Sequence, residues 1–283
     1  MSSDPERAPA ATRSPTTPPP GTGAGSPTTP ATAAPRRLTV ETWIVLGLSL
    51  LKAGVYAVIV LVDRLTQTTS LGGQSTALNP SQSARPWLDL VYQLYSILVP
   101  LVPVALVLYL LAPTFRAAAR RIGLDGSRPW RDLGAGAALA AGIGIPGLGL
   151  YAAGRALGIT VQVQPEALGS AWWTIPVLLL AAAQNGLLEE VVAVGYLSER
   201  LRDLRWRAPA VIVASAVLRG SYHLYQGIGP FVGNAVMGLV FAEVYRRTRR
   251  VAPLVVAHTL MDAFVYVGYA LVPAAWLVAL HLT

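Results

Sequence analysis

The sequence predicts an all-α membrane protein, a polytopic bundle of seven to eight transmembrane helices with a disordered N-terminal tail. Of its 283 residues, 53% are hydrophobic and only 13% are charged, whereas about a quarter of the residues in soluble domains are charged. Apolar stretches long enough to cross a ~30 Å hydrocarbon core, which takes about 20 helical residues, recur along the chain. Lipid is therefore expected to surround most of the folded surface.

The first 38 residues differ in composition from the rest. They are dominated by Pro, Thr, Ala, Gly and Ser and include the run Pro18-Pro19-Pro20. Such a segment buries too little apolar surface to offset the entropy lost on folding. It also lacks the apolar region of a signal peptide. We expect residues 1–38 to form an uncleaved, disordered cytoplasmic tail.

Seven apolar spans follow the tail, and an eighth half-span ends the chain. The spans are placed at residues 42–63, 87–112, 134–154, 172–197, 208–225, 230–245 and 252–272, with the half-span at 273–283. The third span is rich in Gly and Ala, and small residues let helix backbones approach closely in lipid. We divide the chain after the tail into N-terminal transmembrane helices (39–171), a second helix bundle (172–272) and a C-terminal apolar segment (273–283).

Arginines are distributed unevenly between the loops on the two sides of the membrane. One side carries Arg7, Arg13, Arg36, Arg37, Arg116, Arg120, Arg121, Arg128, Arg131, Arg200, Arg202, Arg205, Arg207, Arg246, Arg247, Arg249 and Arg250. The other side carries only Arg64, Arg85 and Arg155. Since basic loops stay in the cytoplasm, we expect a multi-pass protein of the cell (plasma) membrane with a cytoplasmic N-terminus. The preference for Arg over Lys indicates a GC-rich coding genome and a bacterial source.

Composition excludes several classes of site. The chain has no cysteine, which rules out disulfides, thiol nucleophiles, thiolate metal sites and iron-sulfur clusters. The formal net charge of +8 is not gathered into a basic patch interleaved with aromatic residues, so no nucleic-acid partner is expected.

Lys52 and Glu243 also lie within spans, but we attribute them to snorkelling and to pairing with the Arg246–Arg250 cluster. Three other spans contain ionisable residues at membrane depth. They are Glu189, Glu190, Arg219, His223, His258 and Asp262. A charged group in this position costs roughly 2.5–3.5 kcal/mol and usually marks function. Any one of them alone could be a structural hydrogen-bonding residue, but together they can converge on one water-filled cavity.

The order of these residues resembles the CPBP family of intramembrane proteases, the group of type II CAAX prenyl endopeptidases and Abi proteins. The string EEVVAVGYL from Glu189 is similar to the first motif, in which two Glu are followed by three residues, Arg, Gly and a hydrophobic pair. SAVLRGSYHLYQG resembles the second motif, which ends a helix with His223. LVVAHTLMDA resembles the third, with His258 and Asp262. The resemblance covers residues 172–268 and implies a catalytic helix bundle there.

Two positions depart from the family pattern. Val194 stands in place of the motif arginine, and Arg219 stands where a phenylalanine usually precedes the second-motif histidine. Without the motif arginine, Glu190 would be buried with no opposite charge, which is costly. We expect Arg219 to supply that charge from the neighbouring helix.

The resemblance implies a role for each site residue. Glu189 would be the general base that activates a water, and His223 would orient this water. His258 would donate to the tetrahedral oxyanion. An ionised carboxylate cannot donate a hydrogen bond, so Asp262 is expected to orient the His258 ring. Glu190 and Arg219 would support these groups.

Zinc is the alternative to a cofactor-free mechanism. Glu189, His223 and His258 would form a two-His, one-carboxylate set of the kind that holds catalytic zinc. The sequence contains no His-Glu-x-x-His helix, and we expect no cofactor.

The leading interpretation is an intramembrane endopeptidase that hydrolyses a peptide or protein substrate with a Glu-activated water, in a cavity open to the cytoplasm. The alternatives are a catalytically inactive relative that acts as an immunity or scaffold membrane protein, and a small transporter, since buried Glu, His and Asp also serve transport. A bacterial substrate need not be prenylated.

Overall fold

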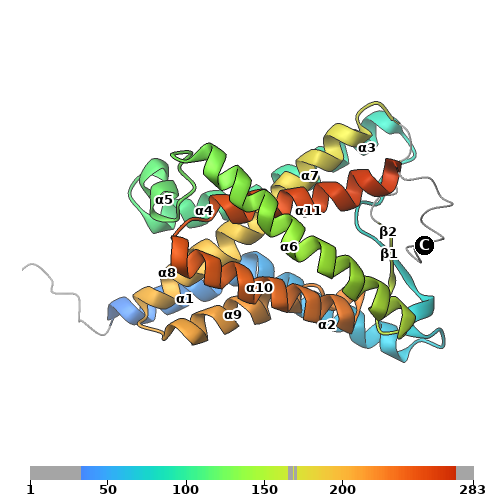
Figure 1. Ribbon diagram of the computed structural model, residues 1–283, viewed down its shortest axis with the longest axis horizontal. Helices are drawn as coiled ribbons and strands as arrows, with labels where there is room; N and C mark the ends of the chain where they lie inside the picture. The colour runs from blue at the N-terminus through green and yellow to red at the C-terminus, as the bar shows by residue number, and fades with distance from the viewer. Residues whose placement is uncertain (1–32, 165–167, 169–170, 272–283) are drawn as a thin grey trace, which may run out of the picture.

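The computed structural model describes residues 33–164, 168 and 171–271, which form a bundle of helices (Figure 1). Within these residues the only sheet is a short parallel pair, β1 (Ser75–Ala77) and β2 (Gln162–Gln164). The all-helical, membrane-like fold expected from the sequence is therefore confirmed.

The helices are α1 (Ala33–Leu48), α2 (Leu50–Thr66), α3 (Pro86–Leu98), α4 (Leu101–Leu111), α5 (Phe115–Arg121), α6 (Pro129–Ala156), α7 (Thr174–Glu189), α8 (Leu197–Asp203), α9 (Ala208–Ser221), α10 (Ile228–Thr248) and α11 (Ala252–Leu271). Two 3₁₀ turns, η1 (Leu71–Gly73) and η3 (Leu224–Gln226), and one π-helix, η2 (Glu190–Tyr196), complete the elements.

The structure supports four or five membrane spans among the described residues, not seven to eight. The segments long and apolar enough to cross a membrane are Pro86–Leu111, Pro129–Ala156, Thr174–Asp203 and Ile228–Thr248. The pair α1 and α2, bent by 52° at its break, makes a fifth if it counts as one span. The expected span at 208–225 is too long, because α9 ends at Ser221 after 14 residues, a length of about 21 Å.

The N-terminal tail and the C-terminal half-span fall mostly outside the described residues. Residues 1–38 were expected to be disordered. The structure describes this segment only from Ala33 onward, where α1 begins. This helix starts earlier than predicted. Pro35 does not prevent this, because it lies in the first turn, where proline is compatible with a helix. The predicted half-span at 273–283 lies outside the described residues.

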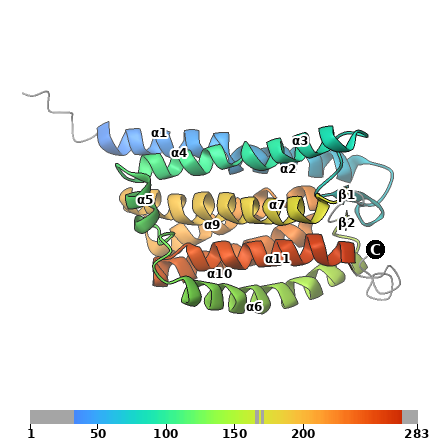
Figure 2. The same cartoon turned by 90° about the horizontal axis from the view of Figure 1, so that it is seen from above.

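The helices run side by side along the length of the molecule in Figure 2, in layers that build up from α1 and α4 on one side to α6 on the other. Between these outer layers, α11 packs against both α6 and α7, and α9 packs against α10. The C-terminal half of the chain, α7 to α11, therefore forms one connected set of helices.

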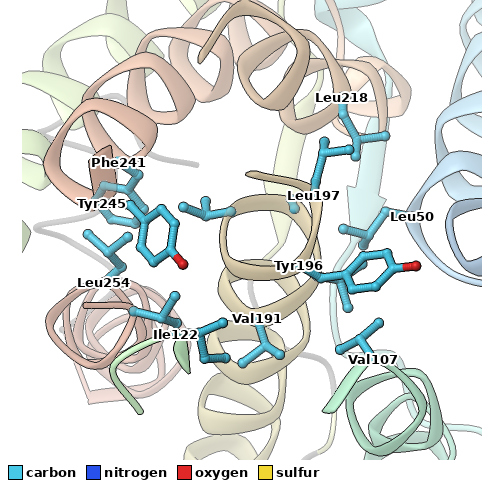
Figure 3. Close-up of a cluster of buried hydrophobic side chains, with 14 of the residues drawn as sticks. Leu50, Val107, Ile122, Val191, Tyr196, Leu197, Leu218, Phe241, Tyr245 and Leu254 are labelled. Atoms are coloured by element: carbon cyan, nitrogen blue, oxygen red, sulfur yellow. The ribbon is translucent and has the colours of Figure 1, made fainter. Parts of the chain in front are cut away.

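The main hydrophobic core surrounds the π-helix η2. Figure 3 shows Val191 and Tyr196 of η2 among apolar side chains from several other helices. The surrounding residues include Leu50, Val107, Ile122, Phe241, Tyr245 and Leu254, all buried. Val194, which stands in the position of the motif arginine, belongs to the same cluster and is fully buried. The core thus fills the half of the bundle that surrounds the residues directly after Glu190.

The two ends of the bundle differ in charge. We call one the arginine-rich end, where ion pairs join Arg200 to Glu41 at 2.6 Å and Arg121 to Asp203 at 3.0 Å. There Arg250 of the loop after α10 also binds Asp132 of α6 at 2.6 Å. The opposite end, which we call the sheet end, holds β1, β2, η1 and η3.

Backbone contacts tie the loops of the sheet end together. Arg155 at the end of α6 donates to the carbonyl of Gly72 in η1 at 2.7 Å. Thr160 forms an isolated β-bridge with Gly227. These contacts hold η3, and with it the segment after α9, beside β2.

Candidate active site

Close helix packing brings the predicted site residues together. A Cβ added to Gly186 of α7 would lie 2.6 Å from the Thr259 hydroxyl and 3.1 Å from the Val255 carbonyl of α11. A Cβ added to Gly238 of α10 would lie 2.7 Å from the Cα of Ala216 in α9. Only glycine allows these approaches, which set α11 beside the glutamates of α7 and η2 and set α9 against α10.

The glutamates lie where the helix changes its winding. Glu189 is the last residue of α7, and Glu190 is the first of the π-helix. π-Turns inside α-helices are rare and occur frequently at functional sites. The carboxylate of Glu190 is fully buried, whereas that of Glu189 is partly exposed to the cavity described below.

Arg219 from the last turn of α9 binds both glutamates. One guanidinium nitrogen donates to Glu189 Oε2 at 3.1 Å, and the other donates to Glu190 Oε1 at 2.5 Å. The side chain of Arg219 is fully buried, and its guanidinium lies 5.4 Å from the ring centroid of Phe241. The ion pair that the sequence suggested between Arg219 and Glu190 is thus present in the structure.

His258 contacts the same oxygen of Glu190 as Arg219 does. Its Nδ1 is 2.6 Å from Glu190 Oε1, and its Nε2 is 3.7 Å from Asp262 Oδ2 and 4.0 Å from Glu189 Oε2. The ring is therefore held between the carboxylates of α7, η2 and α11, with Nε2 directed to Glu189 and Asp262.

Asp262 is fixed by two residues that the sequence analysis did not assign. Asn185 Nδ2 donates to Asp262 Oδ2 at 3.2 Å and to the Tyr266 hydroxyl at 2.9 Å. The Tyr266 hydroxyl donates to Asp262 Oδ2 at 3.3 Å. Asn185 lies four residues before Glu189, and Tyr266 lies four residues after Asp262. This spacing places each on the same helix face as a site residue, and it is a signal that could have found them.

Tyr222 is a third unassigned residue. Its hydroxyl donates to Glu189 Oε2 at 2.6 Å. Tyr222 lies three residues after Arg219, but it follows Ser221, the last residue of α9. The contact depends on the turn after α9, which the sequence pattern did not predict.

His223 stands apart from the other groups. It lies between the end of α9 and η3, and both of its ring nitrogens are buried without a hydrogen-bond partner among the described residues. Its ring centroid is 4.9 Å from that of Tyr222. An unpartnered buried imidazole is costly unless a water or ligand binds it.

A cavity of about 1140 Å³ joins these residues. Glu189, Tyr222, His223, His258 and Asp262 all line it. Its other walls come from α3, α6, α10, β2, η3 and the loop after β1, and they include Gln82 and Val163 at the sheet end. The cavity extends toward the sheet end, because the core around η2 fills the other half of the bundle.

The donor atoms do not fit the zinc set suggested by the sequence. Among the described residues, the group whose possible ligand atoms lie within 4.8 Å of one another is Glu189, Glu190 and His258, without His223. Arg219 already binds both carboxylates of this group. A guanidinium at this distance places a positive charge beside the position that a dication would take, and the two charges would repel each other.

The comparisons with known proteins agree with the order of the motifs. The family model of Type II CAAX prenyl endopeptidase Rce1-like proteins matches residues 171–264, from the segment before α7 into α11. Neither the comparison with curated proteins nor the comparison with solved structures found a match. This segment holds all six of the ionisable residues singled out in the sequence, and over it the chain is similar to the type II CAAX prenyl endopeptidase Rce1-like proteins.

Proposed function

We propose that this protein is an intramembrane endopeptidase in which Glu189 is the general base. The observation that carries the proposal is the position of its carboxylate in the cavity wall. Oε2 accepts hydrogen bonds from Tyr222 and Arg219, whereas Oε1 accepts none from the part of the chain that the structure describes. A water in the cavity can therefore reach Oε1 while the rest of the carboxylate is held in place.

The unpartnered ring of His223 is suited to orient that water. It lines the same cavity as Glu189, and its nitrogens are available for hydrogen bonding. In the first step, the water oxygen bonds to the carbonyl carbon of the scissile peptide, and its proton passes to Glu189 Oε1. In the second step, Glu189 gives this proton to the leaving amide nitrogen as the C–N bond breaks.

His258 is suited to stabilise the oxyanion that forms between these steps. With Nδ1 held by Glu190 at 2.6 Å, a doubly protonated ring can present Nε2–H to the developing negative charge. Asp262 lies 3.7 Å from Nε2 and is itself fixed by Asn185 and Tyr266. It would keep the ring in this orientation, as a positioning residue.

The proposed chemistry uses no metal. Arg219 supplies the positive charge between Glu189 and Glu190 that a cation would otherwise provide. Incubation of the purified protein with 1,10-phenanthroline or EDTA should leave cleavage unchanged. A loss of activity that added zinc restores would overturn this part of the proposal.

The protein is proposed to span the plasma membrane with its arginine-rich end in the cytoplasm. In the described chain, fifteen arginines lie in or beside the loops of that end: Arg36, Arg37, Arg116, Arg120, Arg121, Arg128, Arg131, Arg200, Arg202, Arg205, Arg207, Arg246, Arg247, Arg249 and Arg250. The sheet end carries Arg64, Arg85 and Arg155. The positive-inside rule then also places the N-terminus in the cytoplasm.

Substitution of the general base tests the proposal. Peptide termini in membranes of cells that express the wild type should include new ends that are absent with Glu189→Gln. The matched control is Glu243→Gln, because Glu243 lies at the arginine-rich end of α10 and pairs only with Arg246 and Arg247 among the described residues. Identical termini for wild type and Glu189→Gln, with both proteins present at equal levels, would refute the protease.

A non-catalytic role is the second candidate, and Val194 favours it. The family pattern has an arginine at this position, and here the side chain is apolar and lies in the core. An immunity or scaffold protein would keep its phenotype when Glu189 is replaced by Gln, which separates the two candidates.

A further inference from the structure

The cavity has one polar end, formed by the site, and walls that lead to the sheet end. Besides the site residues, it is lined by Gln82 from the loop after β1, by Val163 of β2 and by Gln226 of η3. Val163 and Gln226 lie near the bridge between Thr160 and Gly227, and Gln82 follows β1, which pairs with β2. The path from Glu189 to the surface therefore leads along the bundle to the sheet end.

The opposite direction is closed by the core. Along the second half of the chain, the cavity wall passes from Glu189 directly to Tyr222, and from Val240 directly to His258. Between these positions lie residues of the buried cluster of Figure 3, among them Val191 and Tyr196 of the π-helix, Tyr245 and Leu254. No residue of α1, α5 or α8 lines the cavity in the described chain.

The charge of the two ends indicates on which side of the membrane the cavity opens. The arginine-rich end is expected in the cytoplasm, and the sheet end is then on the opposite side. We infer that the cavity opens to the extracytoplasmic side of the membrane, and that its substrate is a polypeptide segment on that side. This inference rests on the proposed function for the nature of the substrate, but the direction of the opening follows from the fold and the charges alone.

The wall of the cavity suits an uncharged peptide. Carboxamides from several elements line it: Gln82 in the loop after β1, Gln93 on α3, Gln184 on α7 and Asn234 on α10. Such groups both donate and accept hydrogen bonds, as an extended backbone requires where water is scarce. The lining contains no Lys or Arg in the described residues, and its carboxylates are Glu189 and Asp262. Acidic side chains next to the scissile bond would be repelled.

The absence of cysteine from the sequence allows a direct test by single-cysteine labelling. Gly147→Cys reports on the cavity, because Gly147 lines it and a Cβ there meets no atom within 4 Å. Ala84→Cys reports on the loop after β1, and Thr248→Cys reports on the arginine-rich end. Both positions are exposed. Spheroplasts of a bacterial host that expresses each variant are treated with a charged, membrane-impermeant maleimide, before and after permeabilisation.

Ala84→Cys and Gly147→Cys should both react in intact spheroplasts, and Thr248→Cys should react only after permeabilisation. The inference is overturned if Gly147→Cys follows Thr248→Cys, if it does not react in either condition, or if Ala84 and Thr248 exchange their patterns. Labelling needs no catalysis, so the same pattern is expected in the Glu189→Gln background. Failure of the protease proposal is thereby distinguished from failure of the opening.

Discussion

The guanidinium of Arg219 and the carboxylate of Glu190 form an ion pair at 2.5 Å between α9 and the π-helix, with both side chains fully buried. The two residues are separated by almost thirty positions in the sequence, and each is the nearest opposite charge of the other. Because the cost of removing two charges from water is high, such a pair stabilises the fold only while both partners are present.

A double-mutant cycle on this pair should show strong coupling. Glu190→Gln or Arg219→Met alone should destabilise the protein by about 3–5 kcal/mol, because each removes one partner of a buried ion pair. The double variant should lose much less than the sum of the two. The free energy of unfolding in detergent is measured for all four proteins of the cycle. Additive losses would show that the two side chains are not coupled.

Restoring the family pattern independently tests whether Arg219 takes the place of the motif arginine, which is Val194 here. Val194→Arg alone should destabilise the protein, because Val194 is fully buried among apolar side chains. Arg219→Phe alone should destabilise it by removing the partner of Glu190. Combined, the two substitutions should recover part of the stability of the wild type, measured as the thermal unfolding midpoint. A double variant less stable than both single variants would contradict the exchange of positions.

Removal of the Tyr222 hydroxyl should slow the reaction without unfolding the protein. The hydrogen bond to Glu189 is 2.6 Å long, and hydrogen bonds to charged groups contribute about 1.5–3 kcal/mol. Tyr222→Phe should therefore lower kcat by roughly ten- to hundredfold, with little change in KM. Tyr225→Phe is the matched control, because Tyr225 also lines the cavity but its hydroxyl accepts from Gln226. Equal effects of the two substitutions would argue against a role for Tyr222 at Glu189.

The contact between α7 and α11 should be sensitive to a single methyl group at Gly186. Gly186→Ala places a Cβ 2.6 Å from the Thr259 hydroxyl, and overpacking of this kind costs about 1–3 kcal/mol. We expect a lower unfolding midpoint and lower activity, since α11 carries His258 and Asp262. Gly134→Ala is the control, because a Cβ there meets no atom within 4 Å and alanine is the better helix former. Adding Thr259→Ala should recover part of the loss.

The sequence predicted the composition of the site better than its geometry. Ionisable residues in apolar stretches are visible without a structure, and the pairing of Arg219 with Glu190 followed from the cost of an unpaired buried charge. The turn after Ser221 was not predictable, because the apolar pattern continues through Tyr222 and Leu224. That early turn sets the position of His223 and brings the Tyr222 hydroxyl to Glu189. The direction of the cavity depends on how the core fills around η2, which only the packing of distant helices determines.

The π-helix also sets the rotational phase of the long segment from Thr174 to Asp203. A π-turn holds more residues than an α-turn, and each residue of an α-helix advances the side-chain direction by about 100°. Shortening η2 by one residue would leave a continuous helix, but it would rotate Glu199 and Arg200 away from their ion pairs whenever Glu189 keeps facing the cavity. The wider π-helical turn at residues 190–196 therefore allows one continuous helix to place Glu189 in the cavity wall and also Glu199 and Arg200 in their ion pairs.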